Sequence, residues 1–552
     1  MPERRFTLLI GALALVVASV PYFVGWLLTP AGSVYTGLTT NIDDSDVYLT
    51  WMRHVASGAF FQHNQFCAEP EARQTLLFNL WFLFLGTLSR VLPPILVFHL
   101  ARILGGAALL WAVARLLALA VSDERARKLA FALVCFSAGL GWLIPGNPSL
   151  KPFAFAKATI DTFQHEAITF QSLYYSPLFA PATFAMVVFI TALLRSEQTG
   201  KLRDTLPACL AGFLLGNSHT YDVIPLFAVA FTWRLASDIS QRKVSVSGWL
   251  RLIVIGAATL PSTAHIAYVL KTDAIFRARA NETEPTYTSL LPWVLLGYGF
   301  LLPLGILGAL QKTATPGRGL LICWAVVGVA VAYLPFEFQR KLLMGPHIPI
   351  ALLAGIGLST LAGKLSGDFP KILALFGVLI TLPSNALLLL RDITRLQNNE
   401  SGTAYRPYLS SDEVSALEWL RAHAPPDSIV LVAPDPTSHT RFPNTPLMPH
   451  LAAVVPAHTR CISYNGHWSE TKAYGRKLGE TRRFFSQSTN DSQREALLVA
   501  NKIRYILYLN RLAGADLGDY VPVDWAMGKQ PGALHTVYTG SEVTIFEVSA
   551  DD

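Results

Sequence analysis

The sequence contains few charged residues for its length. Aspartate, glutamate, lysine and arginine make up 15% of its 552 residues, whereas soluble globular proteins carry about 25%. Hydrophobic residues make up 52%, and the mean hydropathy is +0.39. This shortage of charge excludes a cytosolic enzyme, a disordered chain and a nucleic-acid-binding domain. It is typical of a chain that lies mostly in a membrane.

Cysteine is scarce as well. The 5 cysteines include no Cys-x-x-Cys spacing, which excludes a zinc module and a disulfide scaffold. Cys67 and Cys461 lie outside the apolar segments, and the sequence leaves open whether they pair. Lysine and arginine, 44 in all, exceed the 37 acidic residues. An anionic partner would explain this excess, but in a membrane protein it more often marks the loops that stay in the cytoplasm.

The charge is spread unevenly along the chain. Residues 404–552 hold 30 charged residues in 149, against 51 in the 403 residues before them. The polar stretch 391–402 separates the two compositions. The sequence therefore predicts a transmembrane domain over 1–400 and a soluble domain of ordinary size over 401–552.

Apolar runs predict the membrane spans, since a helix needs about 20 apolar residues to cross a bilayer. The first run, 6–28, follows Arg4 and Arg5, which places the N-terminus in the cytoplasm. A cleaved signal peptide is the alternative, but the run is long and no clear small-residue cleavage site ends it. Further spans are predicted at 95–121, 129–146, 177–195, 205–220, 222–236, 249–270, 289–311, 318–335, 347–364 and 371–390. The expected fold is a polytopic α-helical membrane protein with about 11 transmembrane helices and a small C-terminal α/β extracytoplasmic domain.

Basic residues in short loops support this topology. The loops assigned to the cytoplasm carry Arg125, Arg127, Lys128, Arg195, Lys201, Arg203, Arg242, Lys243, Lys312, Arg318, Lys364 and Lys371. If Leu76–Leu92 crossed the membrane, all later basic loops would face outward, against the positive-inside rule. We therefore expect that segment to lie in the outer interface. The long outward loops are then 29–94, 147–176, 271–288 and 336–346, and chemistry is expected there.

The first outward loop holds three carboxylates within four positions, Asp43, Asp44 and Asp46. Val47, Trp51 and Val55 follow at helical spacing, which predicts a short amphipathic helix on the membrane surface. Asp43 or Asp44 serving only as the helix N-cap is the alternative, but a cap needs one carboxylate. Clustered carboxylates can instead supply a general base or oxygen ligands for Mg²⁺ or Mn²⁺.

Two further clusters of ionisable residues lie at predicted outer ends. Asp161, His165 and Glu166 stand close to a span, where ionisable groups are expensive and tend to be functional. His219 and Asp222 stand between two closely spaced spans. A hairpin turn that satisfies free backbone groups is the alternative explanation for the second cluster.

Arg340 and Lys341 are basic residues on the side that the positive-inside rule leaves poor in them. Paired cations at bilayer depth suit a lipid phosphate, arginine as a fork and lysine as a point charge. Snorkelling side chains that only fix a helix end are the alternative.

The C-terminal part alternates helix and strand signals, which predicts a small α/β domain. Helices are expected over 411–424 and 492–503, strands at 428–432 and 505–509, and a hairpin with a Gly-Ser turn over 537–546. The segment Gly466-His-Trp-Ser-Glu-Thr471 makes His467, Trp468 and Glu470 candidates for binding a sugar or covering the membrane site. A loop leading into a helix over 469–486, with Ser469 as N-cap, is the alternative.

Together these residues resemble the GT-C superfamily of integral-membrane glycosyltransferases. The resemblance rests on the N-terminal span, the acidic motif Asp43-Asp44-Ser-Asp46, the surface helix, and Phe98-His-Leu-Ala-Arg-Ile103 at the start of the second span. It covers roughly residues 1–390 and is strongest over 1–130. The superfamily includes protein O-mannosyltransferases, oligosaccharyltransferases and the aminoarabinose transferase of lipid A. The tail shows no Trp-Trp-Asp-Tyr-Gly-like segment, which argues against an oligosaccharyltransferase.

The resemblance implies a function and assigns roles. Such enzymes transfer a sugar, with inversion, from a polyprenyl-phosphate donor to an acceptor outside the bacterial plasma membrane. By the resemblance Asp44, or less directly Asp43, is the base, Glu166 with Asp161 supplies the second acidic position, and Arg340 and Lys341 hold the lipid phosphate. The remaining candidates for donor or acceptor binding are Asp46, His165, His219, Asp222, His467 and Glu470. Metal use varies in the superfamily, and Asp43, Asp44 and Glu166 would be the ligands if one is bound.

Two rival functions remain to be weighed. A transporter or flippase of lipid-linked sugars would be expected to show internal repeats and charges at mid-bilayer, and the sequence shows neither. A sensor whose tail binds a ligand would leave Asp43, Asp44 and Glu166 without a role.

Overall fold

The structure is a computed structural model that describes residues 2–144, 158–282, 285–311, 317–400, 405–437, 447–525, 528 and 530–549. The chain forms two compact units. Unit 1 comprises Met1–Val20, Leu96–Ala267 and Glu284–Arg391, and unit 2 comprises Pro21–Ile95, Tyr268–Thr283 and Asp392–Asp552. Unit 2 thus joins most of two predicted outward loops to the C-terminal part of the chain. The predicted domain boundary at residue 400 stays a prediction.

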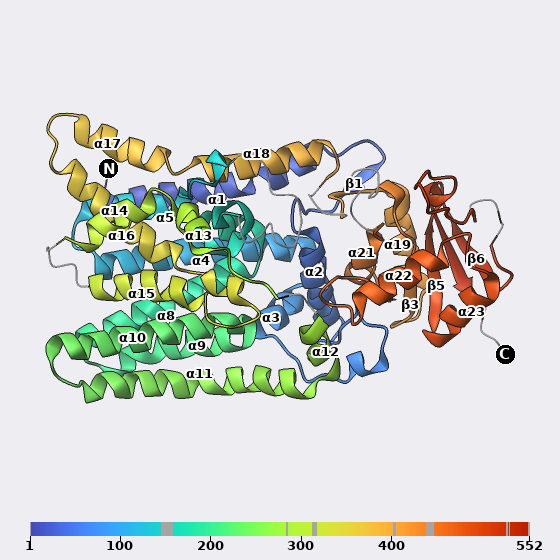
Figure 1. Ribbon diagram of the computed structural model, residues 1–552, viewed down its shortest axis with the longest axis horizontal. Helices are drawn as coiled ribbons and strands as arrows, with labels where there is room; N and C mark the ends of the chain where they lie inside the picture. The colour runs from blue at the N-terminus through green and yellow to red at the C-terminus, as the bar shows by residue number, and fades with distance from the viewer. Residues whose placement is uncertain are drawn as a thin grey trace. The chain divides into compact units, whose positions relative to one another are not determined.

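Unit 1 is helical (Figure 1). Its helices are α1 (Glu3–Leu27), α4 (Pro94–Ala120), α5 (Glu124–Phe136), α6 (Ile160–Phe163), α7 (Thr169–Tyr175), α8 (Phe179–Thr199), α9 (Leu206–Ser218), α10 (Val223–Gln241), α11 (Val246–Thr272), α13 (Leu291–Tyr298), α14 (Leu301–Ala309), α15 (Arg318–Val331), α16 (His347–Ala362), α17 (Phe369–Leu379) and α18 (Pro383–Gln397). Short 3₁₀ turns connect them: η2 (Gly141–Leu143), η4 (His165–Ala167), η5 (Leu202–Thr205), η6 (Thr220–Asp222) and η7 (Gln339–Leu343). Helices α1, α11 and α18 each continue into unit 2.

Six helices in the described residues are long and apolar enough to cross a membrane, or eight spans if two bent helix pairs are each counted as one. The pairs are α13 with α14, bent by 83°, and α17 with α18, bent by 43°. Each predicted span contains a helix or one of these pairs, although residues 145–146 of the third span lie outside the described residues. The helical membrane architecture is thus as predicted, while the count of eleven crossings stays a prediction.

Small residues bring the central helices of unit 1 together. Helix α16 packs against both α14 and α5. A Cβ atom added at Gly355 of α16 would lie 2.4 Å from the Ala130 backbone of α5, and one at Gly308 of α14 would lie 2.0 Å from the Leu353 carbonyl oxygen of α16. Small residues let helix backbones approach closely in lipid, where no hydrophobic driving force holds the helices together. These positions therefore require glycine.

Unit 2 combines helices with a small sheet. Its N-terminal elements are β1 (Ser33–Tyr35), α2 (Ile42–Ala56), η1 (Pro70–Arg73), α3 (Leu80–Leu88) and α12 (Ala274–Glu282). Its C-terminal elements are β2 (Tyr408–Ser410), α19 (Ser411–His423), β3 (Ile429–Val432), α21 (Leu451–His458), β4 (Ile462–Ser463), α22 (Tyr474–Phe484), α23 (Asp491–Ala500), β5 (Ile503–Leu509), η8 (Asn510–Leu512), β6 (Leu534–Thr539) and β7 (Val543–Val548). Helix α3 has 9 residues and is about 13.5 Å long, so it does not span a membrane, as expected for Leu76–Leu92.

The sheet has the strand order β4-β3-β5-β7-β6. Strands β4, β3 and β5 run parallel, and β7 and β6 add to β5 as an antiparallel hairpin. Strands β3 and β5 are buried along most of their length and lie in the hydrophobic core, as expected for strands covered on both faces. A separate two-stranded pairing joins β1 to β2, with Tyr35 opposite Tyr408.

The predicted elements of the C-terminal part are confirmed, with one correction. Helix α19 begins with a capping box between Ser410 and Glu413, the signature that marks a helix start in sequence. The helix predicted over 469–486 begins only at Tyr474, so Ser469 is not its N-cap. The residue in that position is Ala473, which has a positive φ of 54°. The prediction was wrong because tertiary contacts hold the preceding residues in turns, as described below.

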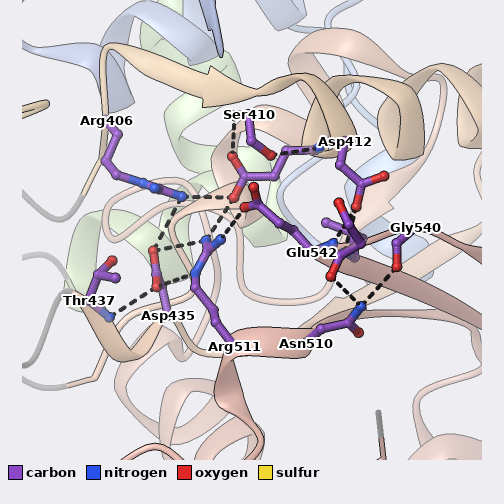
Figure 2. Close-up of polar contacts among 12 residues, drawn as sticks. Arg406, Ser410, Asp412, Asp435, Thr437, Asn510, Arg511, Gly540 and Glu542 are labelled. Atoms are coloured by element: carbon purple, nitrogen blue, oxygen red, sulfur yellow. Dashed lines mark hydrogen bonds and ion pairs between the residues drawn. The ribbon is translucent and has the colours of Figure 1, made fainter. Parts of the chain in front are cut away.

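A network of ion pairs fixes the start of α19 to the ends of β3 and β5 (Figure 2). The buried carboxylate of Glu413 lies 2.8 Å from Arg406 and 2.7 Å from Arg511, and Asp435 lies 3.0 Å from Arg511. The ring of His450 lies between the two carboxylates, 3.3 Å from Glu413 and 2.9 Å from Asp435. Burial by itself would raise the pKa of Glu413, but His450, Arg406 and Arg511 outweigh burial and lower it below its ordinary value.

Replacing Glu413 by Gln should destabilise unit 2 by about 1.5–3 kcal/mol, because Arg406 and Arg511 lose the buried carboxylate that they share. The advantage of the wild type should be complete above the unfolded carboxyl pKa of about 4.3 and should shrink as the pH falls below it, since the folded pKa is lowered. Pulse proteolysis of the full-length protein in detergent measures this. Glu418→Gln, on the exposed face of the same helix, is the control, and equal stability of the two variants would contradict the prediction.

Candidate active site

The predicted acidic cluster lies in the first turns of α2. The helix N-cap is Asn41, which has a left-handed backbone with φ 49° and ψ 44°. The Asn41 side-chain amide donates a hydrogen bond to Asp44 Oδ2 at 3.0 Å. The alternative that Asp43 or Asp44 is the N-cap is therefore wrong. Their negative charges lie in the first turn, where the helix dipole favours them.

Helix α2 is mostly buried within unit 2, and its predicted place at the membrane surface stays a prediction. Phe82 of α3 stacks on Tyr48 and meets Trp51 edge-on, with ring centroids 5.3 Å and 4.9 Å apart. On another side, the Arg53 guanidinium donates to the backbone carbonyl of Pro456 in α21. The apolar side chains of the predicted amphipathic helix therefore pack against these two helices.

The three carboxylates differ in exposure. Asp46 is 2% exposed and Asp43 is 8% exposed, whereas the Asp44 side chain is 40% exposed. Burial, and next the charge of Asp43, raises the pKa of Asp46 well above its ordinary value. Burial, and next the charge of Asp44, raises the pKa of Asp43. Asp44 is therefore the carboxylate of the cluster that a solvent-borne substrate can reach.

His467 faces this cluster from the C-terminal part of unit 2. Its ring is buried, and Nε2 lies 3.4 Å from Asp44 Oδ1 and 3.8 Å from Asp43 Oδ2. Burial opposes a charge on the ring, but Asp44, Asp43 and Glu470 outweigh burial and raise the pKa of His467. The sequence predicted His467 and Asp44 as site residues, and the structure brings them together.

The loop that carries His467 is held by other segments of unit 2. The Glu470 carboxylate pairs with Arg279, and Arg279 also donates to the Ser469 carbonyl at 2.7 Å. The Glu470 carbonyl accepts hydrogen bonds from Asn64 at 2.8 Å and from the Cys67 thiol at 3.1 Å. Glu470 thus anchors the loop here, and its predicted role in binding a sugar stays a prediction. Cys67 and Cys461 are both free thiols.

Arg279 is a residue that the sequence reasoning missed. It lies in α12, within the predicted outward loop 271–288, where basic residues are unexpected by the positive-inside rule. The same signal singled out Arg340 and Lys341 and, applied to this loop, would have found Arg279.

In unit 1, Asp161 and its neighbours form a hydrogen-bonded group. Asp161 is fully buried, its Oδ2 accepts from the Gly141 backbone N–H at 3.0 Å, and its carbonyl accepts from the Gln171 amide at 2.6 Å. His165 Nδ1 lies 3.1 Å from Gln171 Oε1. The His165 ring stacks on that of Tyr175, with ring centroids 3.5 Å apart. These contacts hold Asp161 and His165 in place, and their predicted roles at the site stay predictions. Glu166, in η4, is half-buried.

Arg102, within the motif that carries the resemblance, also holds this region in place. It is buried in α4 and donates to the Leu173 carbonyl of α7 at 3.1 Å and to the Ser19 hydroxyl of α1 at 3.0 Å. Arg102 was not among the predicted site residues. The signal in the sequence that could have found it is an arginine within an apolar run, where a charged residue is costly.

Arg340 and Lys341 lie in η7 with their cations over aromatic rings. The Arg340 guanidinium lies 4.7 Å from the centre of the Phe163 ring, and the Lys341 ammonium lies 4.7 Å from that of Tyr221. Both side chains are half-buried, and neither forms an ion pair with a carboxylate in the described parts of the chain. Rings attract cations without neutralising them, so both charges remain available to an anion.

His219 and Asp222 flank Tyr221 in and beside η6. His219 Nδ1 lies 3.0 Å from Asp222 Oδ2, and Asp222 is fully buried. The His219 ring meets the Tyr221 ring edge-on, with centroids 5.9 Å apart. The structure therefore brings His219, Asp222 and Lys341 around one tyrosine.

Metal binding gains no support from grouped ligands. In the described segments, no three His, Cys, Asp or Glu side chains are arranged to hold a metal ion. Use of Mg²⁺ or Mn²⁺ stays a prediction, and the chemistry below is derived from the side chains alone.

No protein-family model and no curated protein matches the chain. Solved structures do match. The Archaeoglobus fulgidus oligosaccharyltransferase in the apo form is 12% identical with a TM-score of 0.49, over 92% of this chain and 70% of that one. Oligosaccharyltransferase AglB from the same organism, in complex with an inhibitory peptide and a dolichol-phosphate, is 12% identical with a TM-score of 0.46, over 91% and 70%. ArnT from Cupriavidus metallidurans, bound to undecaprenyl phosphate, is 11% identical with a TM-score of 0.48, over 97% of both chains.

These proteins are GT-C membrane glycosyltransferases, the superfamily that the sequence resembles. The sequence argued against an oligosaccharyltransferase, and that expectation stays a prediction because similarity at this identity concerns the fold. The function below is therefore argued from the residues of this chain.

Proposed function

We propose that this protein is an integral membrane glycosyltransferase. It moves one sugar, a hexose or a pentose, from a polyprenyl-phosphate donor to an acceptor outside the membrane, with inversion at the anomeric carbon. The observation that supports this best is the environment of Asp44. It is a half-exposed carboxylate whose two oxygens face Asn41 and His467, beside two buried carboxylates.

Asp44 acts as the general base. The acceptor hydroxyl attacks the anomeric carbon, the bond from that carbon to the phosphate oxygen breaks, and the hydroxyl proton passes to Asp44.

Arg340 and Lys341 stabilise the leaving polyprenyl phosphate. Negative charge develops on the leaving oxygen, and preorganised cations stabilise it as it forms. A planar guanidinium and a compact ammonium side by side suit a phosphate monoester. His219, held by Asp222 next to the ring that supports Lys341, adds a hydrogen-bonding group for the donor.

The remaining assignments complete the proposal. Glu166 provides the second acidic position, and Asp46 and His165 shape the donor and acceptor sites.

The chain crosses the plasma membrane eleven times, with its N-terminus in the cytoplasm and residues 401–552 outside. Mg²⁺ or Mn²⁺ remains a candidate cofactor.

Asp44→Asn should lower sugar transfer by about 10²- to 10⁴-fold, the usual contribution of a general base. Release of undecaprenyl phosphate from synthetic undecaprenyl phosphates that carry one hexose or pentose measures this in the purified protein. Asp516→Asn, an exposed carboxylate of unit 2, is the control. Full turnover by Asp44→Asn would remove this residue from the mechanism, and a wild type that moves the donor lipid without releasing its phosphate would be a flippase.

The double variant Arg340→Gln, Lys341→Gln should weaken binding of undecaprenyl phosphate by about 10²- to 10⁴-fold, since it removes two cations and each hydrogen bond to a charged group is worth about 1.5–3 kcal/mol. Lys371→Gln, a cation with an exposed side chain, should leave affinity unchanged. Equal affinity of the double variant and the wild type would assign both cations to anchoring the helix end.

A further inference from the structure

The two ring nitrogens of His467 have different partners. The backbone N–H of Ser469 lies 3.2 Å from Nδ1, and an N–H needs an acceptor there. In the neutral ring the proton is therefore on Nε2, the nitrogen that faces Asp44 Oδ1 at 3.4 Å. Histidine hydrogen bonds at catalytic groups are often long without substrate and shorten in the reacting complex.

The ring cannot readily move away from Asp44. A Cβ atom at the preceding Gly466 would lie 2.5 Å from the Phe66 ring, so the backbone lies directly against that side chain. On the other side, Thr471 accepts the His467 backbone N–H at 3.1 Å, and Arg279 holds Glu470. The loop is fixed by a hydrogen bond within itself and by contacts with two other segments of unit 2.

Asp44 is held from both sides as a result. Asn41 donates to Oδ2 from within the same helix turn, and His467 approaches Oδ1 from the C-terminal part. The other charged groups that face His467 are Asp43, Asp46 and Glu470. A carboxylate that is contacted at both oxygens has fewer orientations open to it than one contacted at a single oxygen.

We propose that His467 is a positioning residue for Asp44, which it orients by donating from Nε2 to Oδ1. This inference rests on the proposed function, in which Asp44 accepts the proton of the acceptor hydroxyl. Without His467 the carboxylate would sample other rotations, and a reacting group displaced by about 1 Å costs up to about 10²-fold in rate. The C-terminal part of the chain thereby contributes directly to the geometry of the base.

The test compares His467→Ala, His467→Gln and His467→Asn in the full-length protein, with the synthetic donors named above. His467→Ala should lower kcat by about 10- to 100-fold and leave KM for the donor unchanged. Gln places its amide nitrogen near the position of Nε2 and should restore most of the rate, whereas the shorter Asn should not. His535→Ala, on the exposed face of β6, is the matched control.

A second comparison separates positioning from a structural role. In the Asp44→Asn background, His467→Ala should lower the residual rate no further, because His467 acts through Asp44. An equal loss in both backgrounds, or Gln no better than Ala at equal thermal stability, would overturn the inference. Failure of the proposed function is a different result, namely full turnover by Asp44→Asn whatever the His467 variants do.

Discussion

The burial of like charges at the start of α2 is the constraint on which the rest of unit 2 depends. Asp43 and Asp46 lose most of their hydration there, and neighbouring carboxylates repel one another in a medium of low dielectric constant. Such an arrangement needs compensation from fixed dipoles and hydrogen-bond donors. The helix N-terminus supplies one and Asn41 another, and the ring of His467 faces the cluster with Nε2 3.4 Å from Asp44. The contacts of Arg279, Asn64 and Cys67 with the loop at Glu470 follow from the need to keep His467 in place.

Basic side chains in this protein have two kinds of partner, carboxylates and aromatic rings. In the C-terminal sheet, Arg406 and Arg511 pair with buried carboxylates, and the charges cancel within the fold. In unit 1, Arg340 and Lys341 lie over aromatic rings instead, which orient the cations and leave their charge available. The first arrangement supports stability and the second suits an anionic ligand. The same residue types therefore serve different ends according to the partners that the fold provides.

Much of the fold could be predicted because its signals are local. Apolar runs marked the helices of unit 1, and the capping residues Ser410 and Glu413 marked the start of α19. Predictions failed where distant segments decide the outcome. The helix at 469–486 starts late because Arg279 and Asn64 hold the loop before it. Within the site, the pairing of His467 with Asp44 joins residues more than 400 positions apart, and no periodicity encodes that. The sequence singled out His467 and Asp44 separately by their chemical type, but it did not predict that they lie close to each other.

Chemical rescue tests most directly whether Asp44 is the base. The variant Asp44→Ala removes the carboxylate and leaves space near its former position, and formate is a small carboxylate that can occupy it. We expect sugar transfer by Asp44→Ala to be about 10²- to 10⁴-fold slower than in the wild type and to rise with formate concentration, while the rates of the wild type and of Asp44→Asn do not respond. Wild-type turnover by Asp44→Ala in the absence of formate would contradict a role for Asp44 as the base.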